Sequence, residues 1–116
     1  MTPELEPLVH AVLADLDSDD CDIAWILDAV RDSCPGAPYD LLEQTVLRIV
    51  GELVGRGLAE AHPFCEPPNA VTSAEGVVDE VRRGWDALGD QLSMGDVGYL
   101  RITPAGRAAA RSSSHA

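Results

Sequence analysis

Apolar residues recur at intervals of three and four along most of the chain, which is the spacing of one face of an amphipathic helix. Together with helix-capping residues, this spacing predicts helices at residues 3–16, 23–33, 39–56, 72–92 and 104–111. Two short segments between them, residues 58–62 and 97–102, predict strands. The predicted order is therefore three helices, a strand, a helix, a strand and a final short helix.

Residues suited to N-cap positions mark the predicted helix starts. They are Thr2, Asp22, Asp40, Thr72 and Thr103. Pro3 and Pro104 suit the first helical position after such a cap. Glu43 and Glu75 lie three residues after Asp40 and Thr72, where a capping box needs an acidic side chain.

The apolar stripes of the first four helices predict a shared core. Its residues are Leu5, Leu8, Val9, Val12, Leu13, Leu16, Ile23, Ile26, Leu27, Val30, Leu42, Thr45, Val46, Ile49, Val50, Leu53, Val78, Val81, Trp85, Leu88 and Leu92. Trp25 lies opposite the stripe of its helix, and we expect the fourth helix to cover it. The alternative is an exposed aromatic ring beside Asp28 and Asp32, which would suit a basic partner.

With the inserted helix set aside, the predicted order is the winged-helix plan of three helices, two strands and a final helix. The segment GYLRITPAGRAAA, residues 98–110, resembles the end of the wing in MarR-type and PadR-type winged-helix regulators. We therefore expect a mostly helical α+β fold, with a winged-helix-like three-helix core and a two-stranded antiparallel hairpin. The hairpin carries a helical insertion at residues 63–96. One domain is expected over residues 1–111, followed by a disordered tail at 112–116.

A wider resemblance is to a group of small, acidic, uncharacterised actinobacterial proteins. It rests on the segments ELVGRGLAEA, RRGWDALG and GDVGYLRITPAGR, and it covers most of residues 39–107. This resemblance implies a fold and no particular chemistry.

Charge separates this chain from most nucleic-acid-binding proteins. The formal net charge is -12, and the chain contains no lysine. Residues 1–34 hold Arg31 as their only arginine, against Glu4, Glu6, Asp15, Asp17, Asp19, Asp20, Asp22, Asp28 and Asp32. Such a field repels nucleic acid and anionic membranes and attracts basic partners. An acidic surface also aids solubility, and composition alone leaves that simpler explanation open.

The cysteines indicate a reducing compartment. Their number, three, is odd. Cys21 and Cys34 flank a predicted helix that would separate them by about 18 Å, beyond the roughly 4.4–6.8 Å that a disulfide permits between Cα atoms. No apolar run is long enough to span a bilayer, and the acidic residues 1–7 do not resemble a secretory signal. We therefore expect a cytoplasmic protein that does not insert into membranes.

A calcium loop is one candidate chemistry. Asp15, Asp17 and Asp19 align with the first ligands of an EF-hand loop. However, Asp20 stands where that loop needs glycine, and Ile26 stands where it needs glutamate. We interpret the run as a solvated acidic turn.

His62 and Cys65 have a spacing that could hold zinc, but a second ligand pair is missing. Cys21 or Cys34 would have to come from elsewhere. A Cys65 nucleophile with His62 or His10 as its base has no supporting local signature. We therefore predict no catalytic residue, no metal and no cofactor, with His62 a surface residue and Cys65 a small apolar filler.

These observations favour a non-enzymatic, acidic protein-binding module. Its sharpest form is an immunity or antitoxin-like protein that neutralises a basic partner. Asp19, Asp20, Asp28 and Asp32 would steer the encounter, and Trp25 would be the apolar anchor.

The alternative is a DNA-binding transcription regulator, which the charge disfavours. Gln44, Arg48 and Arg56 of the third helix would meet the DNA, and so would Arg82, Arg83 and Arg101 around the wing. A homodimer formed through the first or fourth helix would concentrate these arginines into a basic stripe. A DNA mimic, whose carboxylates imitate phosphates, is a variant of the protein-binding hypothesis.

Overall fold

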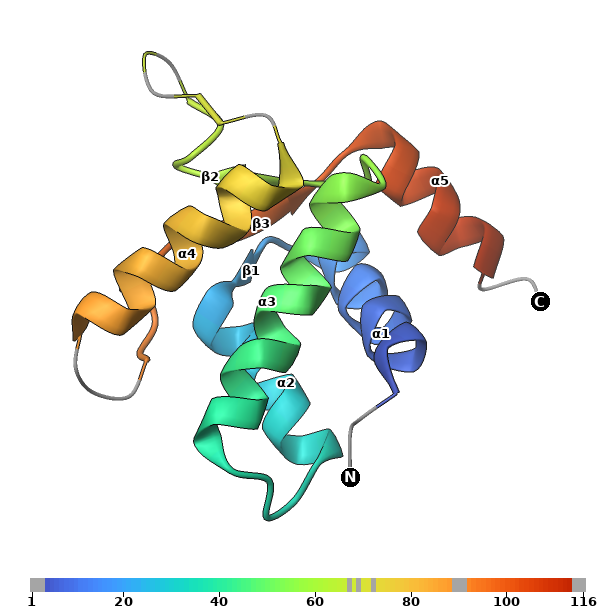
Figure 1. Cartoon of the computed structure of the whole chain (residues 1–116). Helices are drawn as coiled ribbons and strands as arrows, with labels where there is room; N and C mark the ends of the chain where they lie inside the picture. The colour runs from blue at the N-terminus through green and yellow to red at the C-terminus, as the bar shows by residue number, and fades with distance from the viewer. Residues whose placement is uncertain (1–3, 67, 69, 72, 89–91, 114–116) are drawn as a thin grey trace.

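The computed structural model describes residues 4–66, 68, 70–71, 73–88 and 92–113. Within these residues the chain forms five helices and a three-stranded antiparallel sheet (Figure 1). The helices are α1 (Leu5–Ser18), α2 (Ile23–Ser33), α3 (Tyr39–Gly55), α4 (Ala74–Leu88) and α5 (Pro104–Ser113). The strands are β1 (Cys21–Asp22), β2 (Ala59–His62) and β3 (Tyr99–Ile102). The prediction of a mostly helical α+β fold is confirmed.

β3 is the central strand of the sheet, whose order is β1–β3–β2. Leu100 of β3 lies opposite Cys21 on one side and Ala61 on the other. The predicted hairpin partners, β2 and β3, do pair, and α4 lies in the connection between them. The prediction of only two strands was wrong, because β1 adds a third. A strand of two residues is too short to leave an alternating pattern in the sequence.

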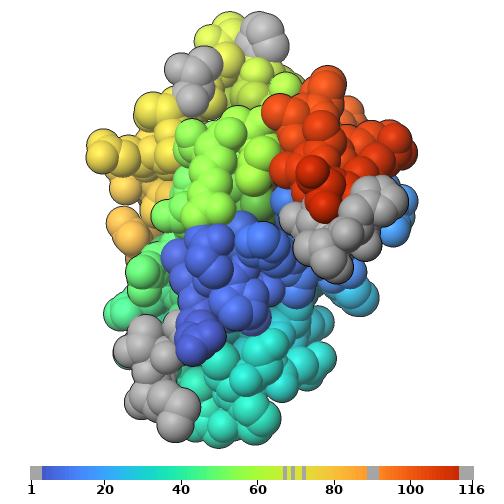
Figure 2. All heavy atoms as spheres, turned by 90° about the vertical axis from the view of Figure 1, so that its right-hand side faces the viewer, coloured from blue at the N-terminus to red at the C-terminus, as the bar shows by residue number. Residues whose placement is uncertain are grey.

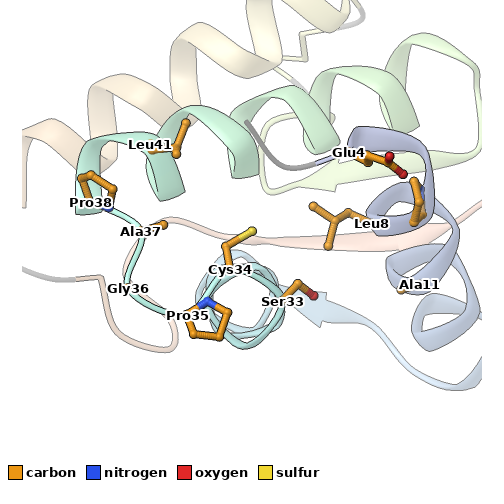
Figure 3. Close-up of a pocket in the computed structure, with 11 residues that line it drawn as sticks. Glu4, Leu8, Ala11, Ser33, Cys34, Pro35, Gly36, Ala37, Pro38 and Leu41 are labelled. Carbon is orange, nitrogen blue, oxygen red and sulfur yellow. The ribbon is translucent and has the colours of Figure 1, made fainter. Parts of the chain in front are cut away.

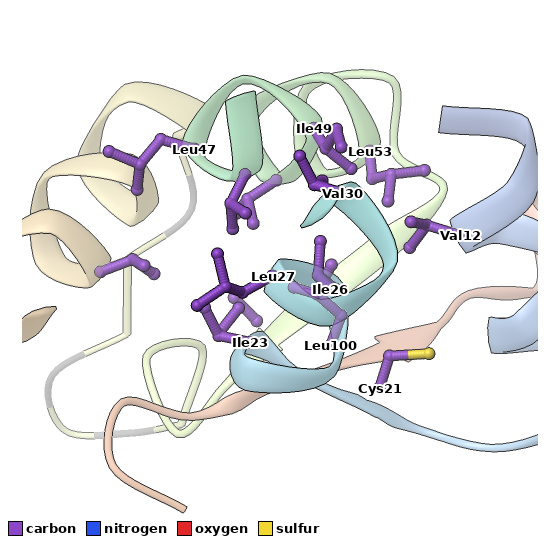
Figure 4. Packing of buried hydrophobic residues seen from close by; sticks show 14 of the residues in the cluster. Val12, Cys21, Ile23, Ile26, Leu27, Val30, Leu47, Ile49, Leu53 and Leu100 are labelled. Carbon is purple, nitrogen blue, oxygen red and sulfur yellow. The ribbon is translucent and has the colours of Figure 1, made fainter. Parts of the chain in front are cut away.

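The core lies where α1, α2 and α3 pack together beside the sheet (Figure 4). Ile26 and Val30 of α2, Ile49 of α3 and Leu100 of β3 are all fully buried. The stripes predicted for these three helices are buried as expected, except that Leu5 at the start of α1 is only partly buried. Helical periodicity therefore identified most of the core correctly.

Two predicted N-caps are confirmed. The Asp22 carboxylate accepts a hydrogen bond from the Ala24 N–H at 2.9 Å, and the Thr103 hydroxyl accepts one from the Gly106 N–H at 3.0 Å. The prediction that Asp40 caps α3 was wrong: the helix begins at Tyr39, so Pro38 occupies the N-cap position. The extended backbone of Pro38 leads directly into the helix, so Asp40 lies within the first turn.

Several element ends also differ from prediction. α1 begins at Leu5, while Thr2 and Pro3, like Thr72, lie outside the described residues. α5 continues through Ser112 and Ser113, two residues that the sequence analysis assigned to the tail. Residues 114–116 lie outside the described part of the chain.

α4 packs along α3, against a face made of glycines. A Cβ atom added at Gly51 would lie 3.2 Å from Val78 Cγ2, and one added at Gly55 would lie 3.4 Å from Ala74 Cβ. The absence of side chains at these two positions lets the helices approach closely. At the other end of the contact, the Tyr39 hydroxyl accepts hydrogen bonds from Trp85 Nε1 and from the Leu92 N–H, each at 3.1 Å.

The buried stripe of α4 differs from the predicted seam. Val77, Val81 and Trp85 are buried, whereas Val78 is partly exposed and Leu88 is 38% exposed. Leu92 is buried, but it follows the helix instead of ending it. Trp85 is a core residue, as predicted. Two adjacent valines fit the same periodicity, so the sequence did not distinguish the buried one.

α5 approaches the start of β2 closely at Gly106. The Thr103 N–H donates to the Leu58 carbonyl at 3.1 Å, and the Thr103 hydroxyl donates to the Gly57 carbonyl at 2.6 Å. A Cβ atom at Gly106 would overlap the Leu58 carbonyl oxygen and would lie 2.8 Å from Ile102 Cγ1. Glycine is therefore required at this position of the Thr-Pro-x-Gly segment.

We expect Gly106→Ala to lower the free energy of unfolding by about 1–3 kcal/mol, because the new methyl group meets backbone that cannot yield easily. Gly84→Ala is the matched control, because its Cβ would lie 3.7 Å from Val97 Cγ1, an ordinary contact. That control should stabilise α4 by up to about 1 kcal/mol. Urea unfolding followed by circular dichroism measures both. Wild-type stability of Gly106→Ala would contradict the close approach.

Glu43 and Asp86 place two carboxyl groups together between α3 and α4. Burial raises the pKa of Glu43 above its ordinary value, and the neighbouring Asp86 carboxyl raises it further. At pH values just above the ordinary glutamate pKa, Glu43 therefore keeps its proton in the folded protein, whereas it has released this proton in the unfolded chain. The free energy of unfolding consequently falls as the pH rises through this window.

We expect Glu43→Gln to be more stable than the wild type at pH 7, because it removes a carboxylate that folding disfavours. The advantage should shrink as the pH falls through the ordinary glutamate pKa, because below it the carboxyl is protonated in both states. Asp86→Asn should weaken the same pH dependence by removing the second carboxylate. Urea unfolding across this range tests the expectation, and a Glu43→Gln variant less stable than the wild type at pH 7 would refute it.

Candidate functional site

Trp25 is the exposed aromatic residue at the centre of the candidate site. Its side chain projects from α2 away from the core and is 49% exposed. The indole Nε1 lies 3.5 Å from Asp15 Oδ2 of α1, a long hydrogen bond. The favoured prediction that the fourth helix covers Trp25 was wrong, because α4 packs against α3 instead (Figure 1).

Trp25 forms one wall of a shallow groove of about 370 Å³, which we call the Trp25 groove. It is lined by Asp15, Ser18, Asp19, Asp20, Cys21, Asp22, Trp25 and Met94. Met94 is 67% exposed and comes from the segment that leads into β3. The groove therefore combines two exposed apolar side chains with several carboxylates.

The carboxylates of the groove differ in the hydrogen bonds and ion pairs that they already form within the chain. Asp22 caps α2 through one oxygen and accepts from the Gly95 N–H at 2.9 Å through the other. Asp20 pairs with Arg101 at 3.2 Å, and one Asp19 oxygen accepts from the Asp20 N–H at 2.8 Å. Exposed pairs of this kind contribute little to stability. Asp15, Asp19 and Asp20 are therefore the carboxylates that a ligand could engage.

The structure brings only part of the predicted site together. Asp19, Asp20 and Trp25 lie in the groove. Asp28 and Asp32 follow Trp25 along α2 at spacings of three and seven, so they extend the surface and do not line the groove. Asp28 is paired with Arg31 at 3.5 Å.

Sequence reasoning did not assign Asp15, Asp22 or Met94 to the site. Asp15 belongs to the acidic run at the end of α1. Its position one turn before the end of that helix could have indicated that it lies near the site. Met94 gave no signal, because only pairing of β3 with β1 brings its segment to the groove.

The residues predicted to bind DNA have different surroundings from those of the Trp25 groove. Gln44 and Arg48 are exposed on α3, in a groove of about 400 Å³ that also includes Arg82 and Glu52. The remaining arginines of the set each lie beside a carboxylate: Arg56 beside Glu6 and Glu52, Arg82 beside Asp79, Arg83 beside Glu80, and Arg101 beside Asp20. α4 also occupies the Gly51 and Gly55 side of α3. These arginines do not form a free basic face in the described part of the chain.

A larger cavity, of about 800 Å³, opens between α1 and the loop that joins α2 to α3 (Figure 3). Its walls are mostly apolar and include Leu8, Ala37 and Leu41, with Cys34 exposed to the cavity from the end of α2. Glu4 and Ser33 add polar atoms at its margin. Figure 2 shows the neighbouring face, where α5 lies against α1. Asp17 of α1 meets Arg107 of α5 there at 3.5 Å.

The three cysteines are free, as predicted. Burial raises the pKa of the Cys21 thiol to about 11, and the carboxylates of Asp15, Asp19 and Asp20 contribute. Burial likewise raises the pKa of Cys65, with Glu60 adding to the effect. A raised pKa favours the protonated thiol, which is the less nucleophilic form.

The prediction that His62 is a surface residue was wrong. His62 is only 8% exposed, and its ring stacks on Tyr99 with the ring centres 5.2 Å apart. The calcium-loop alignment fails structurally as well, because Asp15 and Asp17 lie within α1 and not in a loop.

Comparison of the chain with protein families, with curated proteins and with solved structures finds no match. Among the described residues, no helix combines the length and the apolar character needed to cross a membrane. The fold and the surface chemistry of the chain itself therefore carry the functional argument.

Proposed function

We propose that this protein is a non-enzymatic binding module whose Trp25 groove receives a basic segment of a partner protein, as an immunity or antitoxin-like protein would. One observation carries the proposal: Trp25 is 49% exposed among carboxylates, with the exposed Met94 beside it. Tryptophan is enriched among the residues that dominate binding energy. The free cysteines support a reducing, cytoplasmic location for this function.

The groove offers a basic side chain two complementary contacts. An arginine or lysine placed over the Trp25 ring would gain a cation–π interaction, and its charged end could reach Asp15 or Asp19. The Asp20–Arg101 pair is a model for this contact within the chain, because a partner's arginine could replace Arg101. Asp28 and Asp32 on the adjoining surface of α2 would attract the partner at longer range.

Selection from a random peptide library against the full chain tests the proposal. We expect the selected peptides to combine arginine or lysine with an apolar residue. Trp25→Ala should weaken their binding at least tenfold, which is about 1.4 kcal/mol. Reversal of charge at Asp28 and Asp32 should slow association and reduce its dependence on salt.

Leu88→Ala is the matched control for loss of an exposed apolar side chain, because Leu88 lies on α4 outside the groove. Glu80→Gln in the same way removes a carboxylate of α4 that does not line the groove. Both controls should bind the selected peptides like the wild type. Selection of acidic or neutral peptides, or unchanged binding by Trp25→Ala, would refute the proposal.

The second candidate function is DNA binding by a winged-helix regulator. The exposure of Gln44 and Arg48 on α3, with Arg82 in the same groove, is the observation that favours it. Against it stand the net charge of -12 and the carboxylates beside the other arginines. A homodimer would be needed to gather enough basic residues on one face.

Titration of labelled random duplex DNA at low salt separates the two functions. We expect no detectable binding, because phosphate contacts are strongest at low salt and this surface offers few cations. Binding that weakens with added salt, and that Arg48→Ala and Arg101→Ala each reduce, would instead favour the regulator.

A further inference from the structure

The end of β2 and the turn that follows it gather three different side chains that can ligate a metal. Glu60 and His62 are two residues apart in β2, so their side chains lie on the same side of the strand. The turn then folds back, with the Cys65 N–H donating to the Ala61 carbonyl at 3.0 Å and the Glu66 N–H donating to the Pro63 carbonyl at 3.1 Å. This turn returns the Cys65 thiol to His62.

The ligand atoms of this cluster lie close to one another. His62 Nε2 lies 3.5 Å from Glu60 Oε2 and 3.4 Å from Cys65 Sγ. The three ligand atoms all lie within 4.8 Å of one another. Among the described residues, no other group of three or more His, Cys, Asp or Glu side chains meets in this way.

These separations suit a tetrahedral zinc-type ion. With metal–ligand bonds of about 2.0–2.3 Å and tetrahedral angles, a nitrogen and a sulfur ligand lie about 3.5 Å apart, and a nitrogen and an oxygen ligand about 3.4 Å apart. The two observed distances from His62 Nε2, 3.4 Å to Cys65 Sγ and 3.5 Å to Glu60 Oε2, match these values, and the third separation lies within 4.8 Å. Sulfur, imidazole and carboxylate are also the ligand types that zinc accepts together.

The other ring nitrogen of His62 is held in the manner of metal-binding histidines. Nδ1 lies 3.1 Å from Glu66 Oε1, so a proton on Nδ1 is donated to this carboxylate and the lone pair stays on Nε2. Stacking on Tyr99, with the ring planes 9° apart, fixes the ring orientation. Gly98 allows this arrangement, because a Cβ there would overlap the His62 carbonyl oxygen.

We propose that Glu60, His62 and Cys65 form a binding site for a divalent transition-metal ion of the zinc type, with Glu66 orienting His62. Three protein ligands leave a fourth position of the tetrahedron for water or for a donor atom from another molecule. Glu60 is exposed and Cys65 is partly exposed, so the ion can enter from solvent.

The surrounding charges are compatible with a cation at this site. Arg101 lies opposite Glu60 in the sheet, but its guanidinium is bonded to Asp20 at 3.2 Å. Glu60 and Glu66 therefore supply negative charge beside His62 without a direct arginine partner of their own in the described residues. The cluster shares no residue with the Trp25 groove.

Titration of the full chain with Co²⁺, a spectroscopic substitute for zinc, tests this site. We expect saturation at one equivalent, with the intense visible absorption of a tetrahedral ion and a near-ultraviolet band from a thiolate ligand. Zn²⁺ should displace the Co²⁺ and abolish both signals. Glu66→Gln should weaken binding about 10–100-fold while leaving the bands in place, because it removes only the orienting group.

Cys65→Ser should remove the near-ultraviolet band and weaken binding at least tenfold. Cys34→Ser is the matched control, since this partly buried thiol lies in another part of the fold and should be dispensable. Glu60→Gln gives a second test on an exposed side chain: the thiolate band should remain and the affinity should fall. Absence of a saturable spectrum in the wild type, or an unchanged spectrum in Cys65→Ser, would overturn the proposal.

Discussion

The central position of β3 is the constraint on which the rest of this structure depends. Its pairing sets Tyr99 opposite Asp22 of β1 and opposite His62 of β2, and it buries Leu100 between the other two strands. The same strand carries Arg101, which meets Asp20 beside the Trp25 groove. One strand of four residues therefore positions both the acidic groove and the Glu60–His62–Cys65 cluster.

α4 adds a fourth helix to the three-helix core and packs against α3. It lies across the glycines of α3 and is joined to that helix by the Tyr39 hydroxyl, which serves both Trp85 and Leu92. Its own arginines pair with carboxylates one turn earlier on the same helix, namely Arg82 with Asp79 and Arg83 with Glu80. The exposed Trp25 and Met94, with the carboxylates beside them, lie outside this contact between α3 and α4.

The candidate sites differ in how far they could be predicted. Asp19 and Asp20 are close to Trp25 in sequence, and the structure places all three in one groove, as the sequence suggested. The exposure of Trp25 was not the favoured prediction, because periodicity shows that Trp25 lies opposite its helix's stripe but not whether another helix covers it. Met94 is about seventy residues away along the chain and could not be assigned. The spacing of His62 and Cys65 in the sequence indicated that they could share a metal ion. That Glu60 joins them depends on the alternation of side chains along β2, and that Glu66 contacts His62 depends on the turn.

The sequence by itself determined the helices, their buried stripes in α1, α2 and α3, and the caps at Asp22 and Thr103, because these depend on contacts within a few residues. Only the tertiary structure decided the third strand, the face of α4 that is buried and the exposure of Trp25. It also decided that His62 turns inward against Tyr99. Each of these depends on which segment, distant in sequence, packs against a given residue. The local periodicity of the sequence does not determine that packing.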